Sequence, residues 1–133
     1  HIGDAAALPR EIQKDLTAII ENTQHYTGTT VQLAINYGGR DEIIRAIKKL
    51  ESRQLAALTE SDFDSMLDTA GVPPVDLVIR TGGEKRLSNF LLWQTAYAEW
   101  YSTDILWPDF TPAHFMEALN NYAHRTRRFG GIV

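Results

Sequence analysis

Apolar residues in the first half of the chain recur at helical spacing in three stretches, which one β-rich run interrupts. Residues 9–27 begin with a proline and carry isoleucine and leucine on one face, so they predict an amphipathic helix. The β-branched and mostly apolar run 29–37 predicts a strand. Two further helices are predicted, one from near Arg40 and one over residues 55–68 with Thr59 as its N-cap.

The second half of the chain continues the alternation of strand and helix. Residues 75–79 form a short β-branched run that predicts a buried strand. Residues 88–97 are apolar nearly all round and predict a buried helix with Ser88 as its N-cap. Thr111, followed by a proline, predicts the cap of a last helix that runs to about Arg128. This alternation is typical of a parallel α/β sheet flanked by helices, and 133 residues are typical of a single domain.

Composition narrows the classes of function. The net charge of −4 at pH 7 gives no overall attraction to polyanions, so we predict no nucleic-acid partner. The chain has no cysteine, which rules out disulfides and zinc–thiolate sites and favours a cytoplasmic protein. No apolar run reaches the ~18 residues of a membrane span. The chain begins with histidine rather than methionine, so we expect it to be a fragment.

Two strand-to-helix connections share one design: an apolar strand, a double glycine, charged residues and a helix. They read LAINYGGRDEI and LVIRTGGEKRLSNF. Ligands of parallel sheets bind beyond the carboxyl ends of the strands, where both double glycines fall. The second connection gathers two arginines, a glycine turn and the N-cap serine, and these features together predict a phosphate site: Arg80, Gly82, Gly83, Arg86 and Ser88.

Spacing alone leaves other interpretations open. In the alternative to a phosphate site, Arg80 pairs with Glu84 and Arg86 is solvated. Glu99 follows an apolar stretch, where a lone charge is costly, so this carboxylate is expected to be ion-paired, metal-bound or at an edge. One carboxylate with diphosphate oxygens and waters is enough to hold Mg²⁺. The basic run that includes Arg128 either complements a helix C-terminus or binds an anion.

The block DLVIRTGGEKRLSNFLLWQTAYAEWYSTDILWPDF closely resembles the C-terminal signature of bacterial cis-prenyltransferases, the family of undecaprenyl diphosphate synthase. NYGGRDEI and the terminal RRFGG resemble the same family in the same order, so the resemblance covers nearly the whole chain. It implies the C-terminal part of the cis-prenyltransferase α/β fold. The implied reaction transfers isopentenyl units from isopentenyl diphosphate onto an allylic diphosphate such as farnesyl diphosphate. Each unit gains a cis double bond, and the polyprenyl diphosphate product is a lipid carrier for cell-wall synthesis.

The resemblance also implies roles for individual residues. By match to the family's motifs, the residues that bind isopentenyl diphosphate are Arg80, Arg86, Ser88, Arg128 and Gly130. The last two belong to an Arg-x-Gly motif that reaches the partner subunit's site in the family's homodimer. Glu84 would support the same pocket, and Glu99 would help to place Mg²⁺ on the diphosphate. The lipid product would bring the enzyme into contact with a membrane.

One segment of the family has no counterpart in this chain. Family members carry, upstream of the region present here, a phosphate-binding loop with an Asp-Gly-Asn-Gly-Arg core and an essential aspartate, and the sequence contains no such segment. We therefore expect the catalytic aspartate to lie outside this chain and the isolated chain to be inactive. Two other hypotheses are a non-catalytic accessory or dimerisation subunit and a generic phosphate-binding module. Against the accessory role, all five matched residues upstream of position 100 are intact: Arg80, Glu84, Arg86, Ser88 and Glu99.

Overall fold

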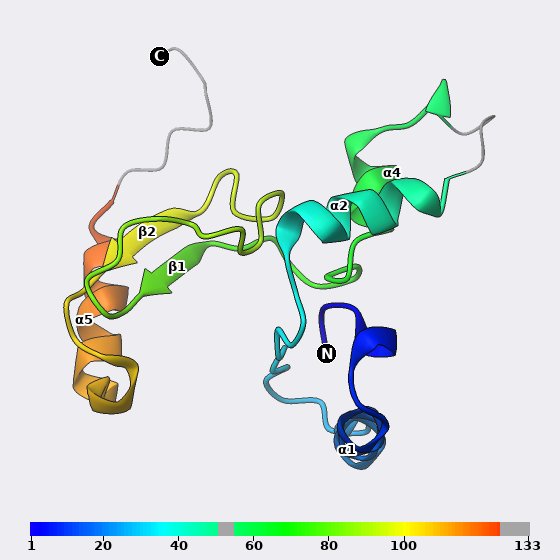
Figure 1. The fold of residues 1–133 in the computed structure, drawn as a ribbon. Helices are drawn as coiled ribbons and strands as arrows, with labels where there is room; N and C mark the ends of the chain where they lie inside the picture. Colours follow the sequence, from blue (N-terminus) through cyan, green and yellow to red (C-terminus); the bar gives the residue numbers. More distant parts are fainter. Residues whose placement is uncertain (51–54, 126–133) are drawn as a thin grey trace. The chain divides into compact units, whose positions relative to one another are not determined.

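The structure is a computed structural model that describes residues 1–50 and 55–125. The chain divides into two compact units, an N-terminal unit (His1–Val72) and a C-terminal unit (Pro73–Val133). Their elements are drawn in Figure 1. Within the described ranges, no helix is long and apolar enough to cross a membrane.

Helices supply most of the regular structure of the N-terminal unit. They include the 3-10 turn η1 (Ala5–Ala7) and the α-helices α1 (Arg10–Thr23), α2 (Gly39–Lys48) and α4 (Glu60–Asp64). The predicted amphipathic helix is confirmed as α1, which ends at Thr23 rather than near residue 27. The predicted cap of α4 is confirmed as well, because Thr59 and Asp62 each accept a hydrogen bond from the other's backbone N–H. This helix is short, since the chain turns after Asp64.

The strand predicted over residues 29–37 is wrong. Among the described residues, this run pairs through an isolated parallel bridge between Ala34 and Ile2, with hydrogen bonds from the Ile2 N–H to the Leu33 carbonyl (2.9 Å) and from the Ile35 N–H to the Ile2 carbonyl (3.2 Å). The Asp4 N–H also donates to the Asn36 carbonyl at 3.1 Å. Val31 is 75% exposed. β-Branched residues favour a strand only when a neighbouring strand provides ladder hydrogen bonds and a surface to pack on. Here the neighbour provides a single bridge.

The C-terminal unit contains a pair of parallel strands, which confirms the predicted α/β class. β1 (Leu77–Arg80) pairs with β2 (Glu99–Ser102), so that the first residues of the two strands lie opposite each other, as do the last. The 3-10 turn η2 (Trp107–Asp109) and the helix α5 (Pro112–Ala123) follow, and α5 packs against β2 (Figure 1). α5 begins at the predicted cap, where His114 Nδ1 accepts the Thr111 N–H at 3.1 Å, but it ends at Ala123 and not near Arg128 as predicted.

The helix predicted over residues 88–97 is also wrong, and Ser88 is not an N-cap. This segment is a succession of turns, in which Ser88 (φ +51°), Asn89 (φ +65°) and Leu91 (φ +46°) are left-handed. A right-handed helix needs φ near −63°, so three such residues in four positions exclude it. Serine and asparagine form hydrogen bonds with nearby backbone that compete with a helix, and asparagine tolerates the left-handed region. Ser88 and Asn89 stand at the point where the helix was expected to start.

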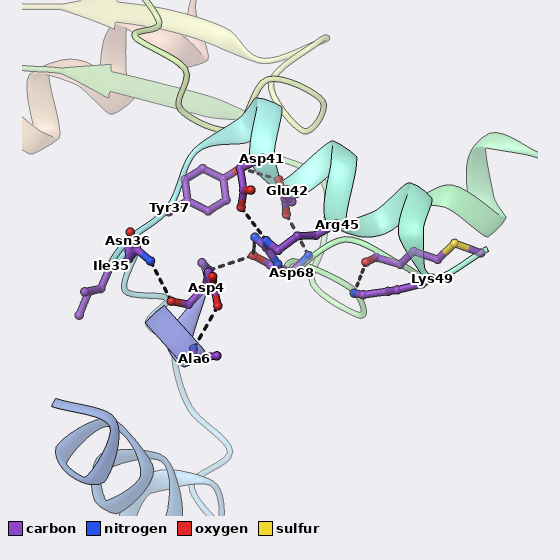
Figure 2. A network of polar contacts seen from close by, with 12 residues as sticks. Asp4, Ala6, Ile35, Asn36, Tyr37, Asp41, Glu42, Arg45, Lys49 and Asp68 are labelled. Atoms are coloured by element: carbon purple, nitrogen blue, oxygen red, sulfur yellow. Dashed lines mark hydrogen bonds and ion pairs between the residues drawn. The ribbon is translucent and has the colours of Figure 1, made fainter. Parts of the chain in front are cut away.

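The N-terminal unit combines a small apolar core with a polar network. Phe63 and Leu67 are buried against Ala46 of α2. Beside this core, Glu42 of α2 is almost fully buried and accepts hydrogen bonds from the Tyr37 hydroxyl (2.5 Å) and the Asp68 N–H (2.9 Å) (Figure 2). A buried carboxylate is tolerated only when it is hydrogen-bonded in this way.

Asp68 and Arg45 form the charged centre of this network. The Arg45 guanidinium donates to both Asp68 oxygens, at 2.7 and 2.6 Å, and Asp68 also accepts the Gly3 N–H at 2.9 Å (Figure 2). One carboxylate thus ties together the N-terminal segment, α2 and the turn after α4. The hydrogen bond from Arg45 holds the pKa of Asp68 below its ordinary value.

We predict that Asp68→Asn lowers the free energy of unfolding by about 2–3 kcal/mol, because it removes one charge of a pair whose aspartate side chain is only 11% exposed. Asp41→Asn is the matched control, since Asp41 also pairs with Arg45 (2.7 Å) but is 59% exposed. It should cost less than about 1 kcal/mol. Urea unfolding followed by circular dichroism measures both losses, and equal losses would contradict the central role of Asp68.

The same ion pair gives the stability a defined dependence on pH. Because the pKa of Asp68 is lower in the folded than in the unfolded state, its stabilisation is complete above the unfolded value of about 3.8. It is lost as the pH falls through the lower folded value. The Asp68→Asn variant should therefore lose less stability than the wild type between about pH 5 and pH 2.

Candidate functional site

The double glycine after β1 forms the tight turn that the sequence predicts. Gly82 (φ +79°) and Gly83 (φ +74°) both adopt the left-handed region, which other residues rarely enter. The Gly82 N–H donates to the Ile105 carbonyl at 2.8 Å, and the Gly83 N–H donates to the Thr103 carbonyl at 2.9 Å. The turn is therefore fastened to the segment that follows β2.

This fastening changes the role expected for the glycines. A Cβ atom on Gly83 would lie 3.2 Å from Asp104 Oδ1, so the close approach that glycine permits here is to residues 103–105. Both glycine N–H groups already have carbonyl partners. Because residues 88–97 do not form a helix, the helix N-terminus that was predicted at Ser88 is not present beside the turn. A phosphate group would have to be bound here by side chains.

Arg80 and Ser88 are brought together by the fold. Arg80 is the last residue of β1, and its Nη2 lies 3.5 Å from Ser88 Oγ. Arg80 is half-buried and Ser88 is exposed, so the pair faces solvent on one side. Two donors that reach one point are an arrangement that suits a phosphate oxygen.

Arg86 pairs with Glu84 rather than remaining solvated alone. Arg86 Nη1 lies 2.7 Å from Glu84 Oε2, and 70% of the arginine side chain is exposed. The alternative interpretation paired Glu84 with Arg80. In the part of the chain that the structure describes, Glu84 is instead the ion-pair partner of Arg86. An exposed pair of this kind contributes about 0–1 kcal/mol. Arg86 can therefore exchange its carboxylate for another anion at little cost.

Glu99 is the first residue of β2 and forms an ion pair. Its Oε2 accepts a hydrogen bond from Arg125 Nη1 at 2.7 Å, with 27% of the glutamate and 35% of the arginine side chain exposed. Spacing alone had left three possibilities for Glu99, and the structure shows the ion pair. Sequence reasoning did not identify Arg125 as the partner, because the two residues lie 26 positions apart.

Glu99 supplies one of the ligands that a magnesium ion needs. Among residues 1–50 and 55–125 there is no group of three or more histidine, aspartate or glutamate side chains that could hold a metal. Glu99 offers one partly exposed carboxylate, a hard oxygen donor of the kind that Mg²⁺ prefers. Mg²⁺ is commonly held by one or two carboxylates together with substrate phosphates and water, so Glu99 fits that arrangement.

Strand register separates Glu99 from Arg80. Leu77 lies opposite Glu99 and Arg80 lies opposite Ser102. Side chains alternate along a strand, so Glu99 shares a face with Leu77, and Arg80 points to the other face at the other end of the pair. Tyr101, two residues after Glu99, lies on the same face as Glu99, and it contacts α5. The helix α5 therefore covers the Glu99 face. Burial raises the pKa of Tyr101, and a hydrogen bond with the Glu117 carboxylate of α5 raises it further.

Two predicted site residues and one pocket complete the description. Arg128 and Gly130 lie outside the described residues.

In the N-terminal unit, a cavity of about 330 Å³ opens at the first double-glycine connection, and its lining residues are Asp4, Asn36, Tyr37, Gly38 and Asp41. This lining contains two carboxylates and no basic side chain. It would therefore repel a diphosphate, and the second connection is the better candidate.

Comparison with known proteins identifies the family. The family model described as "Putative undecaprenyl diphosphate synthase", a prenyltransferase model, matches residues 1–130. The chain therefore belongs to this prenyltransferase family, as its motifs predict. It is 57% identical to the isoprenyl transferase of Treponema denticola and 51% identical to that of Treponema pallidum, over 98% and 99% of its length.

Solved structures agree with this family. The chain superposes with a TM-score of 0.90 on lavandulyl diphosphate synthase from Lavandula x intermedia, crystallised in complex with dimethylallyl diphosphate, at 37% identity. It superposes with a TM-score of 0.83 on a probable undecaprenyl diphosphate synthase from Campylobacter jejuni, at 40% identity. In both cases 98% of the chain is covered. The chain spans between 57% and 61% of the length of these four proteins.

Proposed function

We propose that this chain forms the isopentenyl-diphosphate part of a cis-prenyltransferase. The enzyme transfers isopentenyl units onto an allylic diphosphate, such as farnesyl diphosphate, with formation of cis double bonds. Its product is a polyprenyl diphosphate, the lipid carrier for cell-wall synthesis. The observation that carries the proposal is the contact of Arg80, at the carboxyl end of β1, with Ser88, two positions after Arg86 in the sequence, in a chain of this family.

At the turn after β1, side chains bind the diphosphate in this proposal, and the backbone of the double glycine does not. Arg80 and Arg86 bring planar guanidinium groups that suit bidentate contacts with phosphate oxygens, and Ser88 adds a hydroxyl donor. Glu84 keeps Arg86 neutralised until the substrate replaces it. Arg128 and Gly130 are proposed to bind the same substrate from the partner subunit, as the family's Arg-x-Gly motif does. The bound alkene is then held in position to attack the allylic carbon.

Glu99 is proposed to hold Mg²⁺ together with diphosphate oxygens and water. When bound, Mg²⁺ neutralises part of the negative charge of the diphosphate. Glu99 contributes a single carboxylate at the start of β2, and 27% of its side chain is exposed. Its ion pair with Arg125 keeps this carboxylate compensated until then.

The diphosphate site is tested by comparing two neighbouring cations. Arg86→Ala should weaken isopentenyl diphosphate binding, measured by calorimetry with Mg²⁺ present, by about ten-fold or more, since a hydrogen bond to a charged group is worth about 1.5–3 kcal/mol. Lys85→Ala removes the same charge from an exposed position on the same loop and should change affinity by no more than about three-fold. Equal losses would indicate general basicity. No binding by the folded wild-type chain would favour the accessory-subunit alternative.

We further propose that the isolated chain turns over no substrate, because it lacks the Asp-Gly-Asn-Gly-Arg segment that supplies the family's essential aspartate. Chain elongation from farnesyl diphosphate and radiolabelled isopentenyl diphosphate should be absent with the 133-residue chain and Mg²⁺. It should appear when the chain is fused behind the upstream part of the Treponema denticola relative. Elongation by the chain alone would overturn this proposal, and a folded fusion without activity would favour the accessory role.

We also propose a cytoplasmic homodimer in which both compact units of the chain form one domain. The family match runs through both units without a break, which supports the single domain. The dimer is supported by strand register, since Arg80 and Glu99 face opposite sides of the β1–β2 pair. If both act on one diphosphate, they come from two different copies. Membrane contact would come through the lipid product.

Mixing two inactive variants of the fusion protein tests this arrangement. Arg80→Ala and Glu99→Gln should each abolish most activity, and co-refolding them in equal amounts should restore about a quarter of the wild-type rate. The reason is that half of the dimers are then mixed, and each mixed dimer has one site free of both substitutions. If both residues act within one copy, mixed dimers contain no intact site and the rate stays at the level of the single variants.

A further inference from the structure

Arg125 lies between two partners at the end of α5. Its Nη1 donates to Glu99 Oε2 at 2.7 Å, and its Nε donates to Asn121 Oδ1 at 3.0 Å, one helical turn earlier. Two of its five N–H groups are thus engaged with the described residues. The guanidinium is anchored on the helix side by a neutral amide and on the sheet side by the carboxylate that the proposed function assigns to Mg²⁺.

We propose that Arg125 is a positioning residue that changes partners when the substrate arrives. Without ligand, it compensates the charge of Glu99. When Mg²⁺ and the diphosphate bind, Glu99 turns to the metal and the Arg125 guanidinium moves to a diphosphate oxygen. This inference rests on the proposed role of Glu99 and extends it to a residue that the family motifs quoted above do not include.

The Arg125–Glu99 contact is weak enough to be exchanged. One nitrogen meets one oxygen, so the pair is not bidentate, and both side chains are about a quarter to a third exposed. Ion pairs of this kind shift an equilibrium by no more than about five-fold. The Asp68–Arg45 pair in the N-terminal unit is the contrast, because it is bidentate and its aspartate is nearly buried.

Reach and charge favour the second half of the exchange. Mg–O bonds are about 2.0–2.1 Å long, so any oxygen that shares the metal with Glu99 lies within about 3–4 Å of its carboxylate oxygen. The Arg125 Nη1 already lies 2.7 Å from that oxygen. A rotation of the side chain therefore reaches the diphosphate, with the Asn121 contact as the pivot. One Mg²⁺ does not neutralise both a carboxylate and a diphosphate, so a cation next to the metal is favourable here in addition to the proposed Arg80 and Arg86.

A purely structural role makes a different prediction. If Arg125 only fastens the end of α5 to β2, its removal makes Glu99 less well positioned. The affinities for Mg²⁺ and for the diphosphate then both fall. If Arg125 changes partners, its removal exposes the Glu99 carboxylate to Mg²⁺ but deprives the diphosphate of a cation. The two affinities then move in opposite directions, which loosening alone does not produce.

Calorimetry on the 133-residue chain separates these roles. Arg125→Gln should bind Mg²⁺ alone about two- to five-fold more tightly than the wild type. It should bind isopentenyl diphosphate at saturating Mg²⁺ about ten-fold more weakly. Arg125→Lys keeps a mobile cation and should recover most of the diphosphate affinity. Arg10→Gln, which removes an exposed arginine at the start of α1, should change neither affinity by more than about two-fold.

Thermal unfolding of each variant checks that the fold is intact. If Arg125→Gln is less stable than the wild type, the two affinities of Arg125→Lys decide between the roles instead. A parallel fall of both affinities in Arg125→Gln, or no change in either, overturns the exchange. Glu99→Gln distinguishes this failure from that of the proposed function. If Glu99→Gln weakens Mg²⁺ binding while Arg125→Gln changes nothing, only the exchange is wrong. If Glu99→Gln leaves Mg²⁺ binding unchanged, the metal role of Glu99 and the exchange fail together.

Discussion

The parallel register of two four-residue strands decides where the chemical side chains of the C-terminal unit can act. Pairing Leu77 with Glu99 places the Glu99 carboxylate on the face that α5 covers, and the same register sends Arg80 to the other face. A shift of one residue would exchange these faces. The ion pair of Glu99 and the pairing of Arg80 with Ser88 are both compatible with this register, because the two side chains lie on opposite faces.

Ion pairs in the two units differ in a way that matches their tasks. Arg45 and Asp68 are bidentate, largely buried and joined to the Gly3 backbone, so they hold distant segments of the N-terminal unit together. The pairs at the candidate site, in contrast, consist of single contacts on partly exposed side chains: Glu84 with Arg86 and Glu99 with Arg125. Strong pairs resist exchange, whereas weak ones keep arginines charged, compensated and available.

Sequence patterns predicted the elements whose signals are local. The helix α1 has a clear apolar face, Thr59 and Thr111 cap helices through residues three positions away, and Gly82 and Gly83 require left-handed backbone. The patterns failed where a distant partner decides. Residues 29–37 find only a single bridge, and β2 was not predicted because its strand depends on β1, more than twenty positions away. The contact of Glu99 with Arg125 is equally non-local, although the chemistry of Glu99 had left an ion pair open.

The double-glycine turn is hydrogen-bonded to residues 103–105. As a result, the groups that hold the turn are not the groups that are proposed to bind the ligand. Because the glycine N–H groups serve the fold, a diphosphate here would depend on side chains that the fold does not need. Each such side chain can change by mutation without disturbing the turn that presents it. A scaffold of this kind can lose or alter its ligand one residue at a time while it stays folded, which leaves its descendants free to keep the architecture and abandon the chemistry.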